Sequence, residues 1–274
     1  MARSAGAALD RPLGTARAGS GILLTALLFA ACTPYRAPSV ALGGALTEIR
    51  YRQFTLWYDC VRGEPQRFEY HLDYDKGHLK RLDTYRLDPA FPAGCRQQRS
   101  TQRYNAVHPG FDVGHLVPAN QMDNDPVALR EANQMPNLVP QYAGYNRRTW
   151  YATELVAECY RDLRPLEVIG GVVYGNHGRD LANDFFLDSH GLRTPEAFWK
   201  VLLSHDALGG KASVIAWYIP HGEGLGDRLD PYLLSVRALE KRLGPGTPRI
   251  RIPEGLKDIR PATGWPLPRG CERQ

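Results

Sequence analysis

The sequence has no apolar run long enough to cross a bilayer as a permanent helix, which takes about 20 residues. The apolar run from Ile22 to Ala31 is shorter, and it follows arginines at positions 3, 11 and 17. A basic flank before a short apolar core is typical of a signal peptide. We therefore predict that residues 1–31 are a targeting segment and leave them out of the fold prediction.

The end of this segment resembles a bacterial lipobox. Small residues, Ala30 and Ala31, stand directly before Cys32, which would become the lipidated N-terminus, although Phe29 occupies a position where Leu is usual. An ordinary signal peptide cut nearby and a plain membrane anchor are the alternatives. All three predict an exported protein, in the periplasm or anchored at the outer membrane of a bacterium.

The rest of the chain lacks any long linker, internal repeat or low-complexity block. Residues 32–46 are rich in Ala, Pro, Gly and Ser, which predicts a flexible tether. Residues 47–274 are a suitable length for one folded domain.

Strong charge of one sign is also missing. The formal net charge of +5 falls to +3 when the targeting segment, with three arginines and one aspartate, is removed. This balance permits a phosphate-rich partner, and the pair Arg147-Arg148 would attract one, but scattered surface charge explains it equally well. Charge alone does not identify a function.

The cysteines show no CxxC pair and no Cys/His ligand spacing, so a zinc site is not expected. Cys60, Cys95, Cys159 and Cys271 remain after Cys32, an even number for a compartment in which disulfides persist. Four cysteines allow three pairings. We favour Cys60 with Cys95 and Cys159 with Cys271, because these partners are the nearer in sequence.

The secondary-structure pattern mixes short strands and helices. Alternating residues predict a hairpin from 53–60 and 67–74, and short apolar runs predict central strands at 167–174, 197–203 and 212–219. Helical signals lie at 125–134, 146–163 and 235–243, and the second of these has an apolar stripe that should face the core. The predicted fold class is therefore α+β.

A histidine in a Gly-His segment is the first candidate for chemistry. His115 follows Asp112 and Gly114, and a neutral imidazole with a pKa near 6.5 takes a proton from water at ordinary pH. Asp112 would orient its ring or the surrounding turn. A lone Asp-x-Gly-His segment is common in proteins, so by itself it does not indicate a catalytic histidine.

Asn146 and Glu154 are the second candidates, because they lie eight residues apart at the start of the strongest predicted helix. Asn146 is either an N-cap or, through its carbonyl oxygen, a ligand for a hard cation such as Mg²⁺, which needs few protein atoms. Glu154 lies about 12 Å further along a helix and roughly 80° around it, which favours a water-mediated contact with the same ion. An exposed Glu on a solvated face is the alternative.

Together these segments resemble the DNA/RNA non-specific endonucleases, the endonuclease G-like branch of the ββα-metal nucleases. That family carries Asp-Arg-Gly-His, then Ser-Asn-x-x-Pro-Gln, then Asn with Trp four and Glu eight residues later. The matching residues here are Asp112, Gly114 and His115, then Asn137, Pro140 and Gln141, then Asn146, Trp150 and Glu154. Phe198 and Lys200 also resemble the family's Phe-x-Lys-Val strand. The likeness covers roughly residues 56–244.

The resemblance implies a single-domain ββα-metal fold with a central antiparallel sheet flanked by helices. It also implies that His115 deprotonates the attacking water and that Asn146 is the sole protein ligand of Mg²⁺ or Mn²⁺. Glu154 and Asn137 would hold the surrounding water and loop, with Asp112 beside them. DNA and RNA would be cut to products with 5′-phosphates, and a homodimer is a further expectation.

One position departs from the family. Val113 stands where the family has an arginine near the phosphate, so either Arg147 or Arg148 compensates, turnover is lower, or the substrate differs. A second arginine of the family is not clearly matched by Arg81 or Arg86. Losing one charge-assisted contact costs about 1.5 to 3 kcal/mol, roughly ten- to a hundredfold in rate.

Two other readings remain open from the sequence. An inactive descendant would act as an exported nucleic-acid-binding lipoprotein in which Val113 marks decay of the site. A phosphodiesterase with a different substrate would keep the chemistry and change the groove. The intact pair of Asn146 and Glu154 argues against the first of these and not against the second.

Overall fold

The computed structural model describes residues 46–175, 185–204 and 212–271. The predicted targeting segment, Cys32 and nearly all of the predicted tether lie outside these residues. All the described residues belong to one compact unit. No helix in the described ranges has the length and apolar character needed to cross a membrane.

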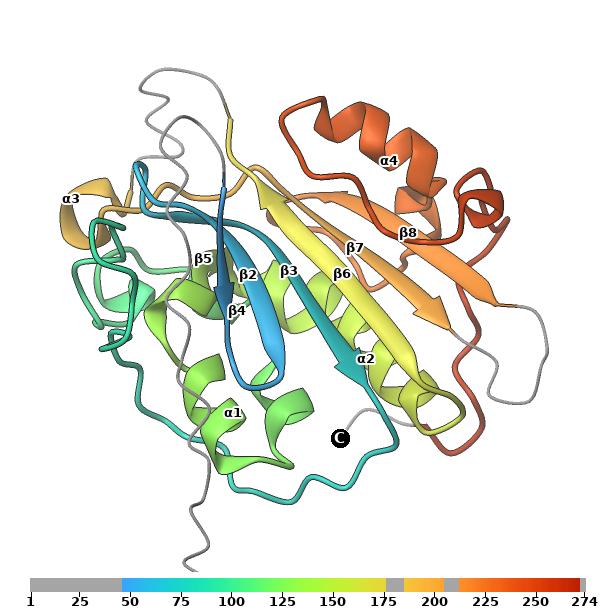
Figure 1. Ribbon diagram of the computed structural model, residues 1–274, viewed down its shortest axis with the longest axis horizontal. Helices are drawn as coiled ribbons and strands as arrows, with labels where there is room; N and C mark the ends of the chain where they lie inside the picture. The colour runs from blue at the N-terminus through green and yellow to red at the C-terminus, as the bar shows by residue number, and fades with distance from the viewer. Residues whose placement is uncertain (1–45, 176–184, 205–211, 272–274) are drawn as a thin grey trace, which may run out of the picture. The chain divides into compact units, whose positions relative to one another are not determined.

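A six-stranded antiparallel sheet in the order β1-β2-β3-β6-β7-β8 forms the centre of this unit (Figure 1). Its strands are β1 Thr47–Arg50, β2 Phe54–Asp59, β3 Glu64–Leu72, β6 Leu166–Val173, β7 Ala197–Ser204 and β8 Ser213–Pro220. The predicted hairpin is β2–β3, and the three predicted central strands are β6, β7 and β8. The edge strand β1 was not predicted.

Both faces of the sheet are covered, because alternate residues of a strand point to opposite faces. On β7, Phe198 and Leu202 belong to the larger core, which also contains Trp150 and Val156 near the start of the long helix. Trp199, Val201 and Leu203 belong to a second core, together with Val236 and Leu239. This two-sided burial explains why β7 reads as a continuous apolar run in the sequence.

Two of the three predicted helices begin within one residue of their predicted starts, and the third differs. α1 (Pro126–Ala132) has Asp125 as its N-cap, and α4 (Val236–Leu243) has Ser235. The exception is the predicted helix 146–163, which is a π-helical turn, Tyr145–Trp150, followed by α2, Tyr151–Arg161. The short α3 (Leu187–His190) and 3-10 turns at Tyr104–Ala106, Ala119–Met122, Met135–Asn137, Asp230–Tyr232 and Glu254–Leu256 complete the elements.

A separate two-stranded sheet holds the segments that carry the sequence motifs. β4 (Phe111–His115) pairs antiparallel with β5 (Leu138–Tyr142), with His115 opposite Leu138. β5 leads within three residues into the π-helical turn and α2. Gly114 is required in this pairing because a Cβ there would lie 2.3 Å from the Gln141 side chain. The two strands and the helix form one β-β-α unit.

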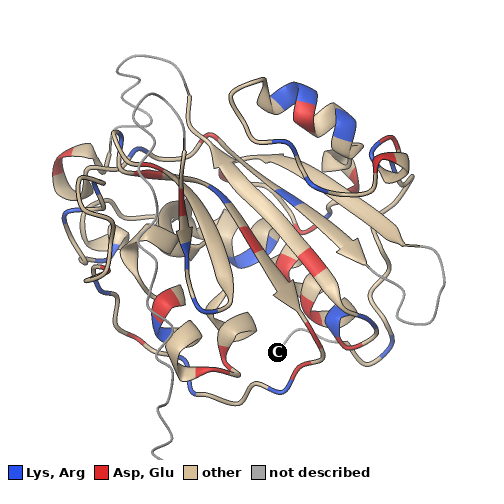
Figure 2. Ribbon diagram, in the orientation of Figure 1, with Lys and Arg blue, Asp and Glu red and all other residues tan. Residues whose placement is uncertain are grey.

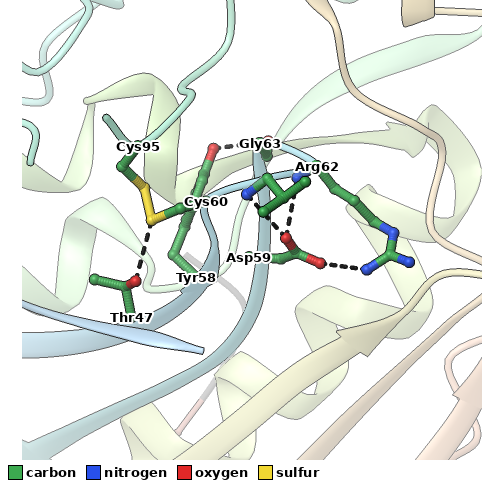
Figure 3. Close-up of a disulfide and its surroundings, with 8 residues drawn as sticks. Thr47, Tyr58, Asp59, Cys60, Arg62, Gly63 and Cys95 are labelled. Atoms are coloured by element: carbon green, nitrogen blue, oxygen red, sulfur yellow. Dashed lines mark hydrogen bonds and ion pairs between the residues drawn. A yellow bond between two sulfur atoms is a disulfide. The ribbon is translucent and has the colours of Figure 1, made fainter. Parts of the chain in front are cut away.

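Two disulfides join the four cysteines in the favoured pairing, Cys60 with Cys95 and Cys159 with Cys271. Figure 3 shows the first beside Thr47, whose hydroxyl oxygen lies 3.1 Å from the Cys60 sulfur. The second closes a span of 112 residues and fixes the C-terminal segment to α2. Tyr160 adds a hydrogen bond of 2.9 Å to the Pro266 carbonyl in the same segment.

Candidate active site

One groove of about 400 Å³ brings together residues from three separate parts of the chain. It lies where β4 ends, beside the π-helical turn and the first turns of α2. The residues that line it are Arg81, Val113, His115, Pro118, Ala119, Asn120, Asn146, Arg147, Tyr151 and Glu154. Of the predicted site residues, His115, Asn146, Arg147 and Glu154 therefore meet in this groove.

His115 is a buried imidazole at the end of β4, 8% exposed. Its Nε2 lies 3.2 Å from Oδ1 of Asn133, whose own Nδ2 donates to the Leu129 carbonyl. Because that second bond makes Oδ1 the acceptor, Nε2 carries the proton and Nδ1 carries the lone pair. Burial, and then the charge of Arg81, lower the pKa of His115 to about 4. The ring is thus neutral and able to accept a proton.

Asp112 does not orient the His115 ring, which corrects the first of its two predicted roles. Side chains alternate along a strand, so residues three positions apart on β4 point to opposite faces. The Asp112 carboxylate instead binds Arg147 through two hydrogen bonds of 2.8 and 2.7 Å and accepts one of 3.1 Å from Asn146 Nδ2. Asn133, which the sequence analysis missed, holds the ring. It lies just past the end of α1, and no sequence motif marks it.

Asn146 is not an N-cap, because it lies inside the π-helical turn and makes no capping hydrogen bond. The bond from its Nδ2 to Asp112 fixes the amide and leaves Oδ1 as the atom available to a cation. Over the described part of the chain, no cluster of three or more His, Cys, Asp or Glu side chains could hold a metal. An amide oxygen plus water molecules is an arrangement that Mg²⁺ accepts. The groove therefore fits a hydrated cation held by Asn146.

Glu154 lines the same groove from the first turns of α2 and is partly buried. Burial raises the pKa of its carboxyl to about 7, while the charges of Lys200 and Arg81 act in the opposite direction. The carboxylate is the acidic side chain of the groove, and its place there suits a contact through the cation's water molecules.

Asn137 is fully buried and does not line the groove. Its Oδ1 accepts from the Val117 N–H at 3.0 Å, and its Nδ2 donates to the carbonyls of Val117 and Ala132 at 2.9 and 2.8 Å. These bonds fix the chain directly after His115. Asn137 is thus placed to hold the loop, as the resemblance implies.

The arginines are distributed differently from our expectation. Arg147 lines the groove, but Asp112 already binds its guanidinium. Arg148 is exposed and is not among the groove residues. Arg81 lines the groove beside Val113, although the sequence left it unassigned because its loop carries no motif. Arg81 therefore brings a positive charge into the groove from a segment far from Val113 in the sequence.

This combination of a β-β-α unit and a groove with a neutral histidine places the chain in the ββα-metal class of α+β proteins. The family model for DNA/RNA non-specific endonucleases matches residues 33–258. The chain belongs to this family and is an endonuclease that hydrolyses nucleic acid. Members of the family are generally metal-dependent.

Two curated relatives agree with this assignment. A nuclease of Nostoc sp. strain PCC 7120 is 26% identical over 224 residues, which cover 76% of each protein. Mitochondrial endonuclease G of Caenorhabditis elegans is 24% identical over 208 residues, 69% of this chain. The match spans 64% of the endonuclease G sequence, slightly under two thirds.

A solved structure shows the same fold. It is the crystal structure of the EndoG/EndoGI complex, which concerns the mechanism of EndoG inhibition. The superposition has a TM-score of 0.57 at 18% sequence identity and covers 71% of this chain and 82% of that chain. At this identity the likeness concerns the fold alone.

The arginine positions lead to a paired prediction. We expect Arg81→Ala to lower kcat/KM on plasmid DNA by roughly ten- to a hundredfold, because one charge-assisted phosphate contact is lost. Arg148→Ala, on the exposed side of the π-helical turn, should change it less than about threefold. Initial rates of supercoiled plasmid loss measure both. A larger effect for Arg148→Ala than for Arg81→Ala would show that Arg148, and not Arg81, supplies the compensating charge.

Proposed function

We propose that this protein is a Mg²⁺-dependent endonuclease, also supported by Mn²⁺, that cuts DNA and RNA with little sequence preference. The observation that carries the proposal is the meeting of His115, Asn146 and Glu154 in one groove, where Asn146 Nδ2 donates to Asp112 and is thereby engaged. A neutral base, a hard oxygen ligand and a carboxylate are the parts that phosphodiester hydrolysis needs.

In this proposal, Nδ1 of His115 takes a proton from the water that attacks phosphorus, and Asn133 keeps the ring in the required tautomer. The bond between phosphorus and the 3′ oxygen breaks, which leaves a 5′-phosphate and a 3′-hydroxyl. The cation, when bound at Asn146, stabilises charge on the phosphate and on the leaving oxygen. Asp112 keeps Asn146 in place, and Arg81 attracts the phosphate backbone.

Broad specificity follows from how such a groove would hold its substrate. Arginines and a hydrated cation recognise phosphate, and phosphate contacts carry no sequence information. Over the described residues, Lys and Arg are interspersed with Asp and Glu (Figure 2). Binding should therefore depend on local contacts at the groove rather than on a large basic surface.

The location and assembly are part of the proposal. We expect export to the periplasm or outer surface of a bacterium, with a lipid on Cys32 or simple signal cleavage. The two disulfides support an oxidising compartment. A homodimer remains our expectation for the assembly.

Val113 supports a second candidate, a catalytically weakened or inactive member that binds nucleic acid as an exported lipoprotein. A valine in the groove cannot donate a hydrogen bond to phosphate. This candidate predicts salt-sensitive binding without turnover.

One cleavage assay distinguishes the two candidate functions. We expect the mature protein to cut plasmid DNA and RNA only with Mg²⁺ or Mn²⁺. His115→Ala and Asn146→Ala should each lose about a thousandfold or more in rate, because each removes a group that the reaction requires. His78→Ala, an exposed histidine outside the groove, is the matched control and should keep its rate. Absence of cleavage by the native protein with either metal would favour the binding protein.

The pH profile gives a further prediction. The useful form of Glu154 is the carboxylate, and burial raises its pKa to about 7, so kcat/KM should fall as the pH drops through that value. The useful form of His115 is the neutral ring, which persists down to about pH 4. The acid limb of the profile therefore belongs to Glu154. The kcat/KM of Glu154→Gln should be low and independent of pH over this range. Bound metal should move the limb to lower pH. An unchanged limb in Glu154→Gln would assign it to another group.

A further inference from the structure

Arg103 is an exposed cation held against the loop that carries Arg81. Its guanidinium carbon lies 5.5 Å from the centre of the Tyr85 ring, and its Nη2 donates to the Asp83 carbonyl at 3.2 Å. Arg81 lines the groove from the same loop. Residues 81–85 therefore bring one guanidinium into the groove and hold a second one beside it.

Two sets of contacts connect Arg103 with His115. The Tyr85 ring, which the guanidinium contacts, has its centre 6.2 Å from the centre of the His115 imidazole. Tyr104, the next residue after Arg103, is fully buried, and its hydroxyl oxygen lies 3.3 Å from the Leu138 carbonyl oxygen. Leu138 is the residue opposite His115 in the β4–β5 pairing. Both the side chain and the backbone of Arg103 are thus fixed close to the predicted base.

The charge of Arg103 has no carboxylate partner in the part of the chain that the structure describes. There, no carboxylate oxygen lies within 4.0 Å of its guanidinium. Arg147 in the groove differs, because two hydrogen bonds join it to Asp112. A guanidinium that stacks on a ring keeps N–H donors at its edge, so Arg103 is able to bind phosphate without leaving Tyr85.

Charge around the groove favours one direction for a bound strand. A second pocket of about 330 Å³ adjoins the groove and shares Asn120, Tyr151 and Glu154 with it. The charged residues that line this second pocket are Asp75, Glu154, Glu158, Asp162 and Arg269. Acidic side chains outnumber the arginine there, which disfavours a phosphate backbone. Further phosphates of a strand are therefore favoured on the other side, where Arg81 lines the groove but not the second pocket.

We propose that Arg103 is a substrate-binding residue: its guanidinium, held over the Tyr85 ring, contacts a phosphate that flanks the scissile phosphate on the same strand. The strand leaves the groove past His115 and over residues 81–85, so its backbone meets Arg81 and then Arg103. Because phosphate contacts carry no sequence information, this contact serves DNA and RNA alike. The inference rests on the proposed function, because it concerns a nucleic-acid strand bound in the same groove.

The alternative role for Arg103 is to support Tyr85 and, through that ring, His115. Kinetics distinguish the two roles. A flanking phosphate is held equally in the ground state and the transition state, so loss of its contact raises KM and spares kcat. Loss of support for His115 would lower kcat instead. Salt dependence gives a second readout, because each lost phosphate contact makes the dependence of log Kd on log salt concentration shallower.

The test uses the intact mature protein and a fluorescent single-stranded oligonucleotide. Binding is measured by fluorescence anisotropy in EDTA over a series of KCl concentrations, and cleavage of the same oligonucleotide is measured with Mg²⁺. The variants are Arg103→Ala, Arg103→Lys and Arg96→Ala. Arg96 is the matched control, because it is also exposed and donates to a single backbone carbonyl, that of Val61, at 3.3 Å.

We expect Arg103→Ala to raise both KM and Kd about tenfold, as loss of one charge-assisted hydrogen bond does. The slope of log Kd against log salt concentration should fall by about one. Arg103→Lys should keep the native slope, because an ammonium also displaces a counterion from the phosphate. Arg96→Ala should keep the native KM, Kd and slope.

An unchanged KM and Kd in Arg103→Ala would overturn the inference and leave the proposed function intact. A fall in kcat with KM unchanged would also overturn it, because Arg103 would then support His115. An equal loss of slope in Arg96→Ala would reduce the effect to general surface charge and contradict a specific contact. Since binding is measured without a divalent cation, native protein that binds but never cleaves would overturn the proposed function alone. Native protein that does neither would overturn both.

Discussion

The antiparallel pairing of β4 with β5 is the constraint on which the site depends. It sets His115 opposite Leu138, and β5 then runs directly into the turn that carries Asn146. A shift of one residue in this pairing would turn His115 away from the groove, because alternate side chains point to opposite faces. The close contact of Gly114 with Gln141 and the three bonds of Asn137 keep the register in place.

Electrostatics sets the chemical state of the groove. Burial and the nearby charge of Arg81 keep His115 neutral, which leaves one ring nitrogen unprotonated. Glu154 is partly buried near two positive charges, Lys200 on the core side and Arg81 in the groove. Asp112 is occupied by Arg147 and Asn146, so it acts through them rather than on the histidine. Each reactive side chain thus has a neighbour that fixes its charge or orientation.

Local patterns in the sequence predicted much of the fold. Alternating and continuous apolar runs located β2, β3, β6, β7 and β8, and Asp125 and Ser235 marked helix starts. The short strands β4 and β5 were not predicted, since their motif residues do not alternate clearly between apolar and polar. The π-helical turn was not predicted either, because its residues share the apolar spacing of the helix that follows.

The site was predictable where the family motif extends and unpredictable beyond it. His115, Asn146 and Glu154 came from spacing and resemblance, and the groove contains all three. Arg81 and Asn133 lie outside the motifs and reach the site only through tertiary packing. The role of Asp112 depends on which face of β4 it occupies, and that was not evident until the strand was known.

The central claim is that Asn146 holds the catalytic cation in this groove. Crystals of the mature protein soaked in Mn²⁺ would test it by anomalous scattering. We expect one peak at a coordination distance of about 2.2 Å from Asn146 Oδ1, with water molecules between the ion and Glu154. A peak elsewhere, with nothing at Asn146, would contradict the account.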